Sequence, residues 1–343
     1  MRSLFIAGLG KAPGKTALCA ALGRTFQEAG KRVSYLKPLS VTTAPEQSAP
    51  GGLDAPFIRR ALGLDEASCR CLISLPSPEA AAFQLHDHLE AIARAHQDQN
   101  ADVVLVEGPE DAEPSERHLE LSRQIAETLG SEIILLARYH TALSAERLAT
   151  AARLLNGRLL GVVLNAAPAT KSFQDTWRSA LSASGGTPCL GILPLNRRLM
   201  GLSVAELART VEGKIITVPE AADAVVENFV VGSMSVDPGP DYFNRLPNKA
   251  VITRMNRPDQ QGAALETSPL ALVMTGGGSP LIYIDYRARE KNIPTIAVQG
   301  DTLWALERIE ESFDRTRLHS LDKLAWFQEL LKQHFDFEVL GLT

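Results

Sequence analysis

A glycine-rich segment near the N-terminus has the residue types and spacing of a loop that holds phosphate groups. Backbone N–H groups of such a turn point at phosphate oxygens, and the N-terminus of the following helix adds partial positive charge. Lys15 would then pair with the β- and γ-phosphates of a nucleotide, and the Thr16 hydroxyl would ligate Mg²⁺. We call residues 8–16 the phosphate loop; its candidate binding residues are Gly8, Gly10, Lys11, Gly14, Lys15 and Thr16.

The spacing of this loop is unusual, because the standard loop has four residues between its two glycines. Leu9 stands where the first glycine belongs, and five residues separate Gly8 from Gly14. The alternative is a glycine-rich turn between a strand and a helix whose lysines bind nothing. A strand before the loop, Gly-Lys-Thr within it and an amphipathic helix after it together favour nucleotide binding.

The elements around this loop follow from the pattern of apolar residues. Short apolar runs alternate with helical patterns through most of the chain, and most runs are continuously apolar, as in parallel strands covered on both faces. This alternation predicts an α/β fold with a doubly wound, mostly parallel sheet. The predicted strands are 4–7, 33–36, 103–106, 133–136, 160–164 and 190–193.

The pattern of apolar runs and helical segments changes after about residue 198. Ser203 and Glu206 have capping-box spacing and predict the start of a short helix. A second α/β series follows, and we expect two domains, residues 1–213 and a smaller α/β domain at 214–343. The predicted elements of this series are strands 250–253, 270–274 and 295–298, a helix at 281–291 and helices from 303 onward.

Composition excludes several classes of protein. Of 343 residues, 45% are hydrophobic and 22% are charged, which is typical of a globular chain and not of a disordered one. The net charge of −5 leaves no broad basic field for nucleic acid. The apolar run after Arg2 is broken by Lys11 and Lys15, and no window reaches about 18 apolar residues, so we expect no export signal and no membrane span. Four cysteines are too few for a disulfide framework and fit a cytoplasmic protein.

Together with the phosphate loop, four further segments resemble dethiobiotin synthetase and its relatives, in the order of that family and across about 200 residues. The resemblance implies that Lys37 faces the phosphates and substrate, that Asp54 and Glu107 help to hold Mg²⁺, and that Asn165 reads the nucleotide base. The segments are Tyr35-Leu36-Lys37-Pro38, Leu53-Asp54-Ala55, Val104-Leu105-Val106-Glu107-Gly108 and Gly161-Val162-Val163-Leu164-Asn165.

The chemistry of these residues agrees with the resemblance. Lys37 follows a strand at the edge where a doubly wound sheet forms its ligand crevice. A cation there would stabilise a transferring phosphoryl group, which makes Lys37 and Lys15 the candidate catalytic residues; the alternative is a surface lysine before a proline. Asp54 and Glu107, with Thr16, supply the oxygen ligands that Mg²⁺ prefers, although Asp54 also fits a helix N-cap.

Two departures from the family argue against dethiobiotin synthesis itself. Ala12 stands where the family has an acidic residue. Gly108 is followed by Pro109, Glu110 and Asp111, where the family has a glycine-rich turn whose N–H groups bind a substrate carboxylate. Proline has no N–H group to donate, and two carboxylates would repel an anionic substrate.

The second domain resembles the DRTGG domain. Arg257-Pro258-Asp259 follows the strand at 250–253, and Thr275-Gly276-Gly277 ends the strand at 270–274. Asn256 replaces the first acidic residue of the signature. Arg257 and the turn at 275–278 would bind a small anion; the alternative is a structural turn beside a helix that Asp301 and Thr302 cap.

The order of the two domains resembles the N-terminal, non-catalytic part of long bacterial phosphotransacetylases and stand-alone proteins of that architecture. We expect no phosphotransacetylase activity, because the acyl-transfer domain is not part of this sequence. We expect a module that binds ATP, or another nucleoside triphosphate, with Mg²⁺, while the DRTGG domain senses a ligand or mediates assembly. The alternative is an ATP-dependent ligase that activates the carboxylate of an unknown small molecule. Related P-loop proteins pair protomers, so we also expect a homodimer.

Overall fold

The computed structural model describes residues 1–10, 12–41, 54–75, 78–109, 116–155, 158–232, 239–313 and 320–342. Lys11, Glu110 and Asp111 lie outside the described residues. The chain divides into two compact units, which we describe separately. Unit 1 comprises Met1–Leu195 and Arg317–Thr343, and unit 2 comprises Asn196–Thr316.

Unit 1 is built on a seven-stranded sheet in the order β3-β2-β4-β1-β5-β6-β7, and all of its strands are parallel. Because the chain moves outward from β1 to β2 and β3 and then returns to β4 and β5, the sheet is doubly wound, as predicted. Its strands are β1 (Arg2–Leu9), β2 (Val33–Val41), β3 (Cys69–Leu75), β4 (Val103–Glu107), β5 (Glu132–Arg138), β6 (Leu159–Ala167) and β7 (Cys189–Pro194).

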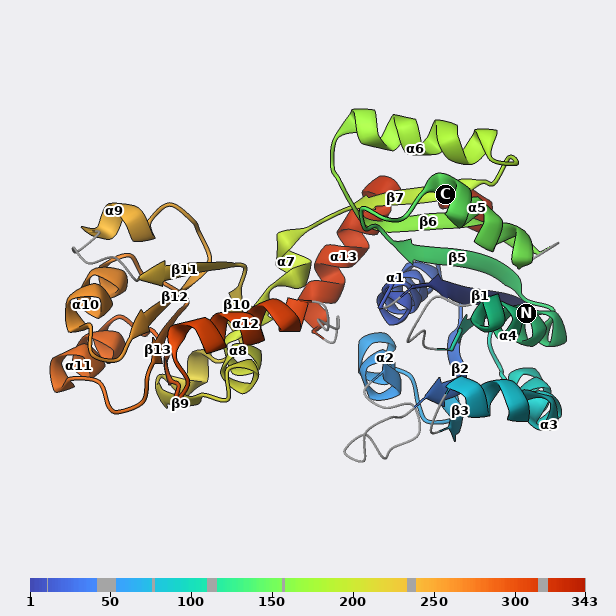
Figure 1. The fold of residues 1–343 in the computed structure, drawn as a ribbon. Helices are drawn as coiled ribbons and strands as arrows, with labels where there is room; N and C mark the ends of the chain where they lie inside the picture. The colour runs from blue at the N-terminus through green and yellow to red at the C-terminus, as the bar shows by residue number, and fades with distance from the viewer. Residues whose placement is uncertain are drawn as a thin grey trace. The chain divides into compact units, whose positions relative to one another are not determined.

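Helices cover both faces of this sheet (Figure 1). One face carries α1 (Lys15–Glu28), α2 (Asp54–Leu62) and α13 (Leu321–His334). The other carries α3 (Pro78–Gln97), α4 (Glu116–Leu129), α5 (Ala145–Leu154) and α6 (Lys171–Ala183). Residues 3–9 of β1 are buried throughout, which explains why the sequence of this central strand is continuously apolar.

The register of the central strands places the end of β4 level with interior residues of β1 and β2. Ile6 lies opposite Glu107 across β1 and β4, and Leu36 lies opposite Val106 across β2 and β4. Lys37 therefore follows at the level of Glu107, next to the start of the phosphate loop. Parallel strands in a doubly wound sheet place their carboxyl ends at the ligand crevice.

Unit 2 holds a smaller sheet in the order β11-β12-β13-β14-β9, parallel except for β9 at its edge, and a two-stranded pair of β8 and β10. Apolar side chains of α8 and α12 pack on one face of the larger sheet, and those of α9, α10 and α11 pack on the other. Its strands are β8 (Leu202–Ser203), β9 (Lys214–Thr217), β10 (Val225–Val226), β11 (Asn228–Gly232), β12 (Lys249–Arg254), β13 (Ala271–Thr275) and β14 (Thr295–Ala297).

The helices of unit 2 begin with α7 (Arg197–Met200) and α8 (Val204–Thr210), and α8 starts with the predicted capping box of Ser203 and Glu206. Short 3-10 turns lie at Pro219–Ala221 in this unit and at Glu338–Leu340 in unit 1. The remaining helices are α9 (Gly239–Phe243), α10 (Pro258–Glu266), α11 (Ile282–Glu290) and α12 (Thr302–Phe313).

The division into units differs from the expected domains 1–213 and 214–343. Helix α8 lies before the expected boundary but belongs to unit 2, because Leu207 and Val211 share a core with Ile296 of β14. Helix α13 lies far beyond the boundary but belongs to unit 1. There Gln328 Nε2 donates to Glu28 Oε1 of α1 at 2.7 Å.

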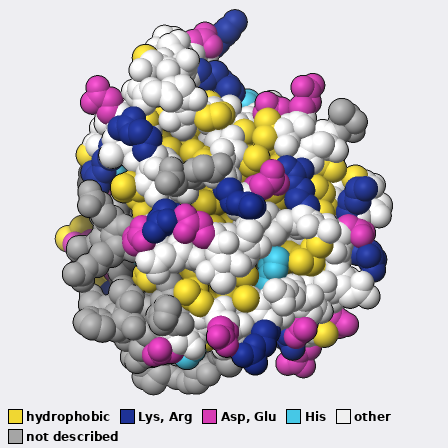
Figure 2. All heavy atoms as spheres, turned by 90° about the vertical axis from the view of Figure 1, so that its right-hand side faces the viewer, with side chains coloured by type: hydrophobic (Ala, Val, Ile, Leu, Met, Phe, Trp, Pro, Cys, Tyr) yellow, Lys and Arg dark blue, Asp and Glu magenta, His cyan; other side chains and the backbone are white. Residues whose placement is uncertain are grey.

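Two surface properties bear on the classes of partner. No helix in the described parts of the chain is long and apolar enough to cross a membrane. On the face shown in Figure 2, the described acidic and basic side chains are interspersed and form no continuous basic field.

Candidate functional site

The phosphate loop joins the end of β1 to the start of α1 through residues with left-handed backbone. Gly10 has φ 86°, Ala12 has φ 46° and Gly14 has φ 102°. Gly14 precedes α1 as its N-cap, and a Cβ atom there would lie 2.9 Å from Asn165 Nδ2. Both the backbone and the available space therefore require glycine at position 14.

Lys15 is the first residue of α1, and its side chain folds back over the start of the loop. A Cβ atom on Gly8 would lie 3.0 Å from Lys15 Nζ, so glycine at position 8 makes room for the ammonium group. Lys15 is buried. The structure thus holds a cation against the loop where the N-terminus of α1 already favours an anion.

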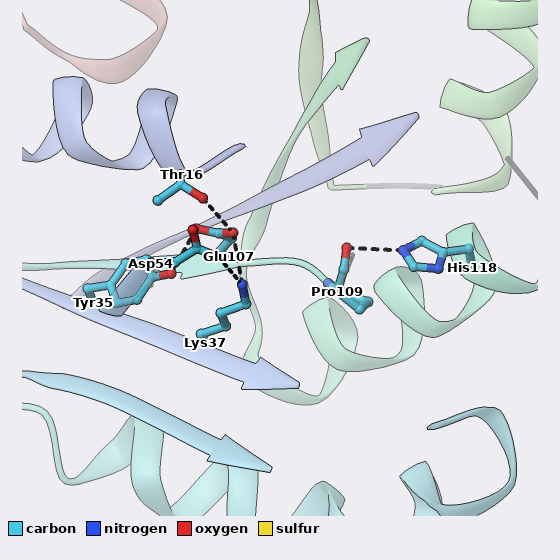
Figure 3. Close-up of polar contacts among 7 residues, drawn as sticks. All are labelled: Thr16, Tyr35, Lys37, Asp54, Glu107, Pro109 and His118. Atoms are coloured by element: carbon cyan, nitrogen blue, oxygen red, sulfur yellow. Dashed lines mark hydrogen bonds and ion pairs between the residues drawn. The ribbon is translucent and has the colours of Figure 1, made fainter. Parts of the chain in front are cut away.

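Glu107 is the centre of a buried cluster beside the loop (Figure 3). It ends β4, and its carboxylate accepts hydrogen bonds from Thr16 Oγ1 at 3.0 Å and from Tyr35 OH at 2.7 Å. Lys37 Nζ lies 3.4 Å from Glu107 Oε1. The close approach of β4 to β1 depends on the next residue, because a Cβ atom on Gly108 would lie 2.9 Å from Ile6 O.

Lys37 joins Glu107 to Asp54, the first residue of α2. Lys37 Nζ lies 2.5 Å from Asp54 Oδ2, and the lysine is completely buried. A buried charge is costly unless it is paired, and here one ammonium lies between two carboxylates. The structure therefore brings together Thr16, Lys37, Asp54 and Glu107, which the sequence suggested from four separate segments.

The protein atoms of this cluster supply only part of the coordination shell that Mg²⁺ requires. Thr16 Oγ1 and Glu107 Oε1 are adjacent hard oxygen atoms, whereas the described carboxylate of Asp54 is bonded to Lys37. Among the described residues no group of three or more His, Cys, Asp or Glu side chains could hold a metal ion. Mg²⁺ commonly binds through one or two carboxylates and completes its shell with phosphate oxygens and water, so this set fits that mode.

Tyr35 is a member of the cluster that sequence reasoning did not assign. It is buried, and burial, with the negative charge of Glu107, raises the pKa of its phenol well above the usual value. The hydroxyl therefore stays protonated and donates to Glu107 Oε2, which fixes the orientation of the carboxylate. The spacing of Tyr35 and Lys37 could have indicated this role, because residues two apart on one strand share a face of the sheet.

His118 of α4 is a second buried group that the sequence did not single out. Its Nε2 lies 3.1 Å from Pro109 O, and because a carbonyl oxygen only accepts, Nε2 carries the proton. Burial, with a smaller effect of the positive charge of Lys15, lowers the pKa of His118 to about 4, although the hydrogen bond to Pro109 O acts in the opposite direction. Neutral His118 thus holds Pro109, which follows Glu107 and Gly108. No local pattern predicts this contact.

Asn165 lies near the end of β6 and contacts the phosphate loop. Its Nδ2 donates to Pro13 O at 2.9 Å, and its Oδ1 accepts from Ala166 N at 2.8 Å. In this structure the side chain therefore supports the loop backbone. Recognition of the nucleotide base by Asn165 stays a prediction.

The residues considered for an anion site in unit 2 form ion pairs and hydrogen bonds with other residues of that unit. Arg257 forms an ion pair with Asp259 at 2.6 Å. Two N–H groups of the glycine turn donate to carbonyl oxygens, Gly276 N to Gly300 O and Gly277 N to Val298 O. These contacts favour the structural alternative for this turn, and Asp301 caps α12 through Trp304 N as expected.

The doubly wound parallel sheet and the phosphate loop with Lys15 against it define a P-loop nucleotide-binding domain. The sequence comparison agrees: residues 2–203 match the AAA domain family, and residues 206–312 match the DRTGG domain. The chain belongs to this AAA domain family, in its dethiobiotin-synthetase-like form, and a DRTGG domain follows. The resemblance expected from the motifs is therefore confirmed.

Similar proteins include phosphate acetyltransferases. One from Deinococcus radiodurans is 29% identical over 82% of this chain and 42% of its own length. One from Haemophilus influenzae is 23% identical over 99% of this chain and 52% of its own length. The chain thus spans about half the length of the curated relatives it matches. The cobyrinic acid a,c-diamide synthase of Mycobacterium smegmatis, solved with ADP and magnesium, is 20% identical over 57% of this chain and 87% of that chain, with a TM-score of 0.36.

Proposed function

We propose that this protein is a nucleotide-dependent regulatory or sensing module. Unit 1 binds ATP, or another nucleoside triphosphate, with Mg²⁺ at the phosphate loop, and the DRTGG domain serves as a ligand-sensing or assembly element. The observation that carries the proposal is the 3.0 Å hydrogen bond from Thr16 Oγ1 to Glu107 Oε1. It sets two hard oxygen atoms beside the start of α1, where phosphates bind.

Each residue near the loop has a distinct part in this proposal. The loop N–H groups and Lys15 hold the phosphates, and Thr16 and Glu107 hold Mg²⁺, with Asp54 as the third proposed ligand. When bound, Mg²⁺ neutralises phosphate charge. Tyr35 keeps the Glu107 carboxylate oriented through its hydrogen bond of 2.7 Å. Asn165, which holds the loop at Pro13, is the residue we propose to face the base.

Two observations favour regulation over catalysis. The turn after Glu107 begins with Gly108 and Pro109, and proline has no N–H group to offer a substrate carboxylate. The carbonyl oxygen of Pro109 accepts a hydrogen bond from His118, which holds Pro109 in place. A site built for carboxylate activation needs donors at this position, and in the described part of the turn the N–H group of Gly108 already donates to Ile6 O.

The second candidate is an ATP-dependent ligase that activates a carboxylate of an unknown small molecule. The observation in its favour is Lys37, whose ammonium lies in the cluster 3.4 Å from Glu107 Oε1. A buried cation in the middle of β2, level with the end of β4, would stabilise charge on a transferring phosphoryl group together with Lys15. We do not propose acetyl transfer, although the curated relatives are named phosphate acetyltransferases.

Titration calorimetry followed by a phosphate-release assay separates the two candidates. The purified protein is titrated with ATP, ADP and GTP, with and without Mg²⁺, and then incubated with ATP and a panel of small carboxylates. Mg²⁺-dependent binding with negligible phosphate release supports the regulatory role. Phosphate release that a carboxylate stimulates contradicts it and supports the ligase.

We further propose a cytoplasmic setting and a homodimer. The partners of this module are then a nucleotide and a small-molecule effector, with neither nucleic acid nor membrane among them. Support comes from the interspersed surface charge in Figure 2 and from the absence of a spanning helix in the described residues. The expected dimer is open to a direct test, and the structure suggests where to look for it.

A further inference from the structure

Unit 2 exposes a cluster of large apolar side chains at the start of α11. Ile282 is 89% exposed and Tyr286 is 67% exposed, and Leu281 and Tyr283 are each about half exposed. Four such residues lie within six positions, and we call this group the α11 patch. Monomeric proteins rarely leave such a patch uncovered, and aromatic residues are enriched at interfaces between proteins.

The patch lies on the outer side of a helix whose inner side is already packed. Ile284 and Ala288 are completely buried and share a core with Leu272 and Met274 of β13. On a helix of 3.6 residues per turn, Ile282 and Tyr286 fall on the opposite side from Ile284 and Ala288. Rotation of the helix to bury the patch would therefore expose its core residues.

Charged residues flank this patch in a self-complementary order. The helix carries Asp285 in its first turn and Arg289 in its last turn. Both lie on one flank of the line through Ile282 and Tyr286, and they pair with each other within the chain at 3.0 Å. The opposite flank carries Arg287, which pairs with Glu266 of α10 at 3.0 Å.

We propose that the α11 patch is the contact surface for a second copy of this chain. A two-fold axis that sets two α11 helices antiparallel keeps the same flank of each helix together. Asp285 of one copy then meets Arg289 of the other, twice, while Ile282 and Tyr286 pack between the helices. Charge self-complementarity beside an apolar centre is what an isologous interface requires.

Sedimentation velocity of the full chain across a range of protein concentrations tests this surface. The wild type is expected to form a dimer, and Ile282→Lys and Tyr286→Lys are each expected to weaken it roughly tenfold or more, because buried aromatic and aliphatic anchors dominate interfaces. Leu303→Lys is the matched control. It changes an apolar residue that is 65% exposed, on α12 at the other face of the same sheet, and is expected to leave the dimer unchanged.

A charge exchange tests the pairing itself. Asp285→Lys and Arg289→Asp each place like charges opposite one another in a homodimer, and each variant alone is expected to be mainly monomeric. Mixed in equal amounts, they restore opposite charges at both contacts and are expected to form a heterodimer. A wild type that stays monomeric at every concentration would overturn the proposal, whatever else covers the patch. So would a dimer that survives Ile282→Lys and Tyr286→Lys, or mixed charge variants that do not associate.

Discussion

At the scale of single residues, the cluster around Glu107 depends on Tyr35, a donor to which the motifs assigned no role. Tyr35→Phe removes the hydroxyl that donates to Glu107 Oε2 at 2.7 Å and leaves a buried carboxylate oxygen without that donor. Hydrogen bonds to charged groups contribute about 1.5–3 kcal/mol, so we expect the free energy of unfolding to fall by about 2 kcal/mol. Urea denaturation measures the change.

Tyr139→Phe is the control for that variant. Tyr139 packs edge-on against Phe173, and its hydroxyl has no hydrogen bond to another described residue. Its loss is expected to change the free energy of unfolding by about 0.5 kcal/mol or less. Equal effects of the two substitutions would show that the Tyr35 hydroxyl does not stabilise Glu107.

Lys37 supplies one positive charge between the carboxylates of Asp54 and Glu107, so we expect stability to depend on Mg²⁺ when this lysine is lost. Lys37→Met removes the cation that lies 2.5 Å from Asp54 Oδ2 and 3.4 Å from Glu107 Oε1, and we expect a destabilisation of about 3–5 kcal/mol. Added Mg²⁺ is expected to raise the melting temperature of Lys37→Met more than that of the wild type. An equal response to Mg²⁺ in both proteins would mean that these carboxylates do not form a cation site.

His118 gives a pH dependence whose sign follows from its low pKa. The folded protein holds His118 neutral, with a pKa of about 4, whereas an unfolded histidine titrates near 6.5. The unfolded state therefore binds more protons between these values, and stability rises with pH in that window. The contribution is complete above about pH 6.5 and is lost as the pH falls to about 4, with a total of about 3 kcal/mol at most.

His118→Gln keeps an N–H donor for Pro109 O but does not titrate. Denaturation of this variant at several pH values between 4 and 7 is expected to show a shallower loss of stability than the wild type. His96, whose pKa is also lowered by burial, remains in both proteins and cancels in the comparison. Parallel pH profiles would show that His118 is not held neutral by the fold.

At the scale of elements, much of unit 1 could be predicted because its central strands carry a strong signal. Residues 3–9 of β1 and 103–107 of β4 are buried, so their apolar runs are continuous. The sequence did not predict β3, an edge strand that includes Arg70 and Ser74 and whose middle residues are only partly buried. An edge strand has one neighbour and a mixed face, which weakens its apolar pattern.

The candidate site shows the same division between local and long-range information. The phosphate loop is a continuous segment with its own spacing, and the place of Glu107 at the end of β4 follows from the rule for parallel sheets. Lys37 was expected after the end of its strand, but β2 continues to Val41 and Lys37 lies within it. The contact of His118 with Pro109 joins a helix to a turn, and the contact of Asn165 with Pro13 joins residues 152 positions apart in the sequence. Neither helical nor strand periodicity carries such a contact.

Helix α13 was expected in the second domain, and its packing in unit 1 leads to a prediction about stability. Leu331 is completely buried in α13. Leu331→Ala is expected to lower the free energy of unfolding of unit 1 by about 2–5 kcal/mol. Thermal unfolding with and without ATP and Mg²⁺ identifies the affected transition, which is expected to be the one that nucleotide stabilises.

Glu329→Ala serves as the control on the same helix, because Glu329 is exposed and its loss is expected to change little. If Leu331→Ala lowered only a transition that does not respond to nucleotide, α13 would belong energetically to the second unit.

At the scale of the whole molecule, a P-loop domain and a DRTGG domain share one chain, and the central claim concerns the first of them. The fold, the left-handed glycines of the loop and Lys15 folded over Gly8 all support a phosphate site. The surface of α11 and the nucleotide site lie in different units, so dimer formation and nucleotide binding can be tested separately.

Calorimetric titration of ATP with Mg²⁺ into the wild type and Lys15→Ala tests the central claim most directly. Lys15→Ala is expected to weaken binding at least tenfold, which is about 1.4 kcal/mol, because it removes the cation that we propose to pair with the phosphates. Lys31→Ala, which removes an exposed lysine after α1, is expected to bind as the wild type does. Equal affinity of Lys15→Ala and wild type, or no binding of ATP to the wild type, would contradict the assignment of the phosphate loop.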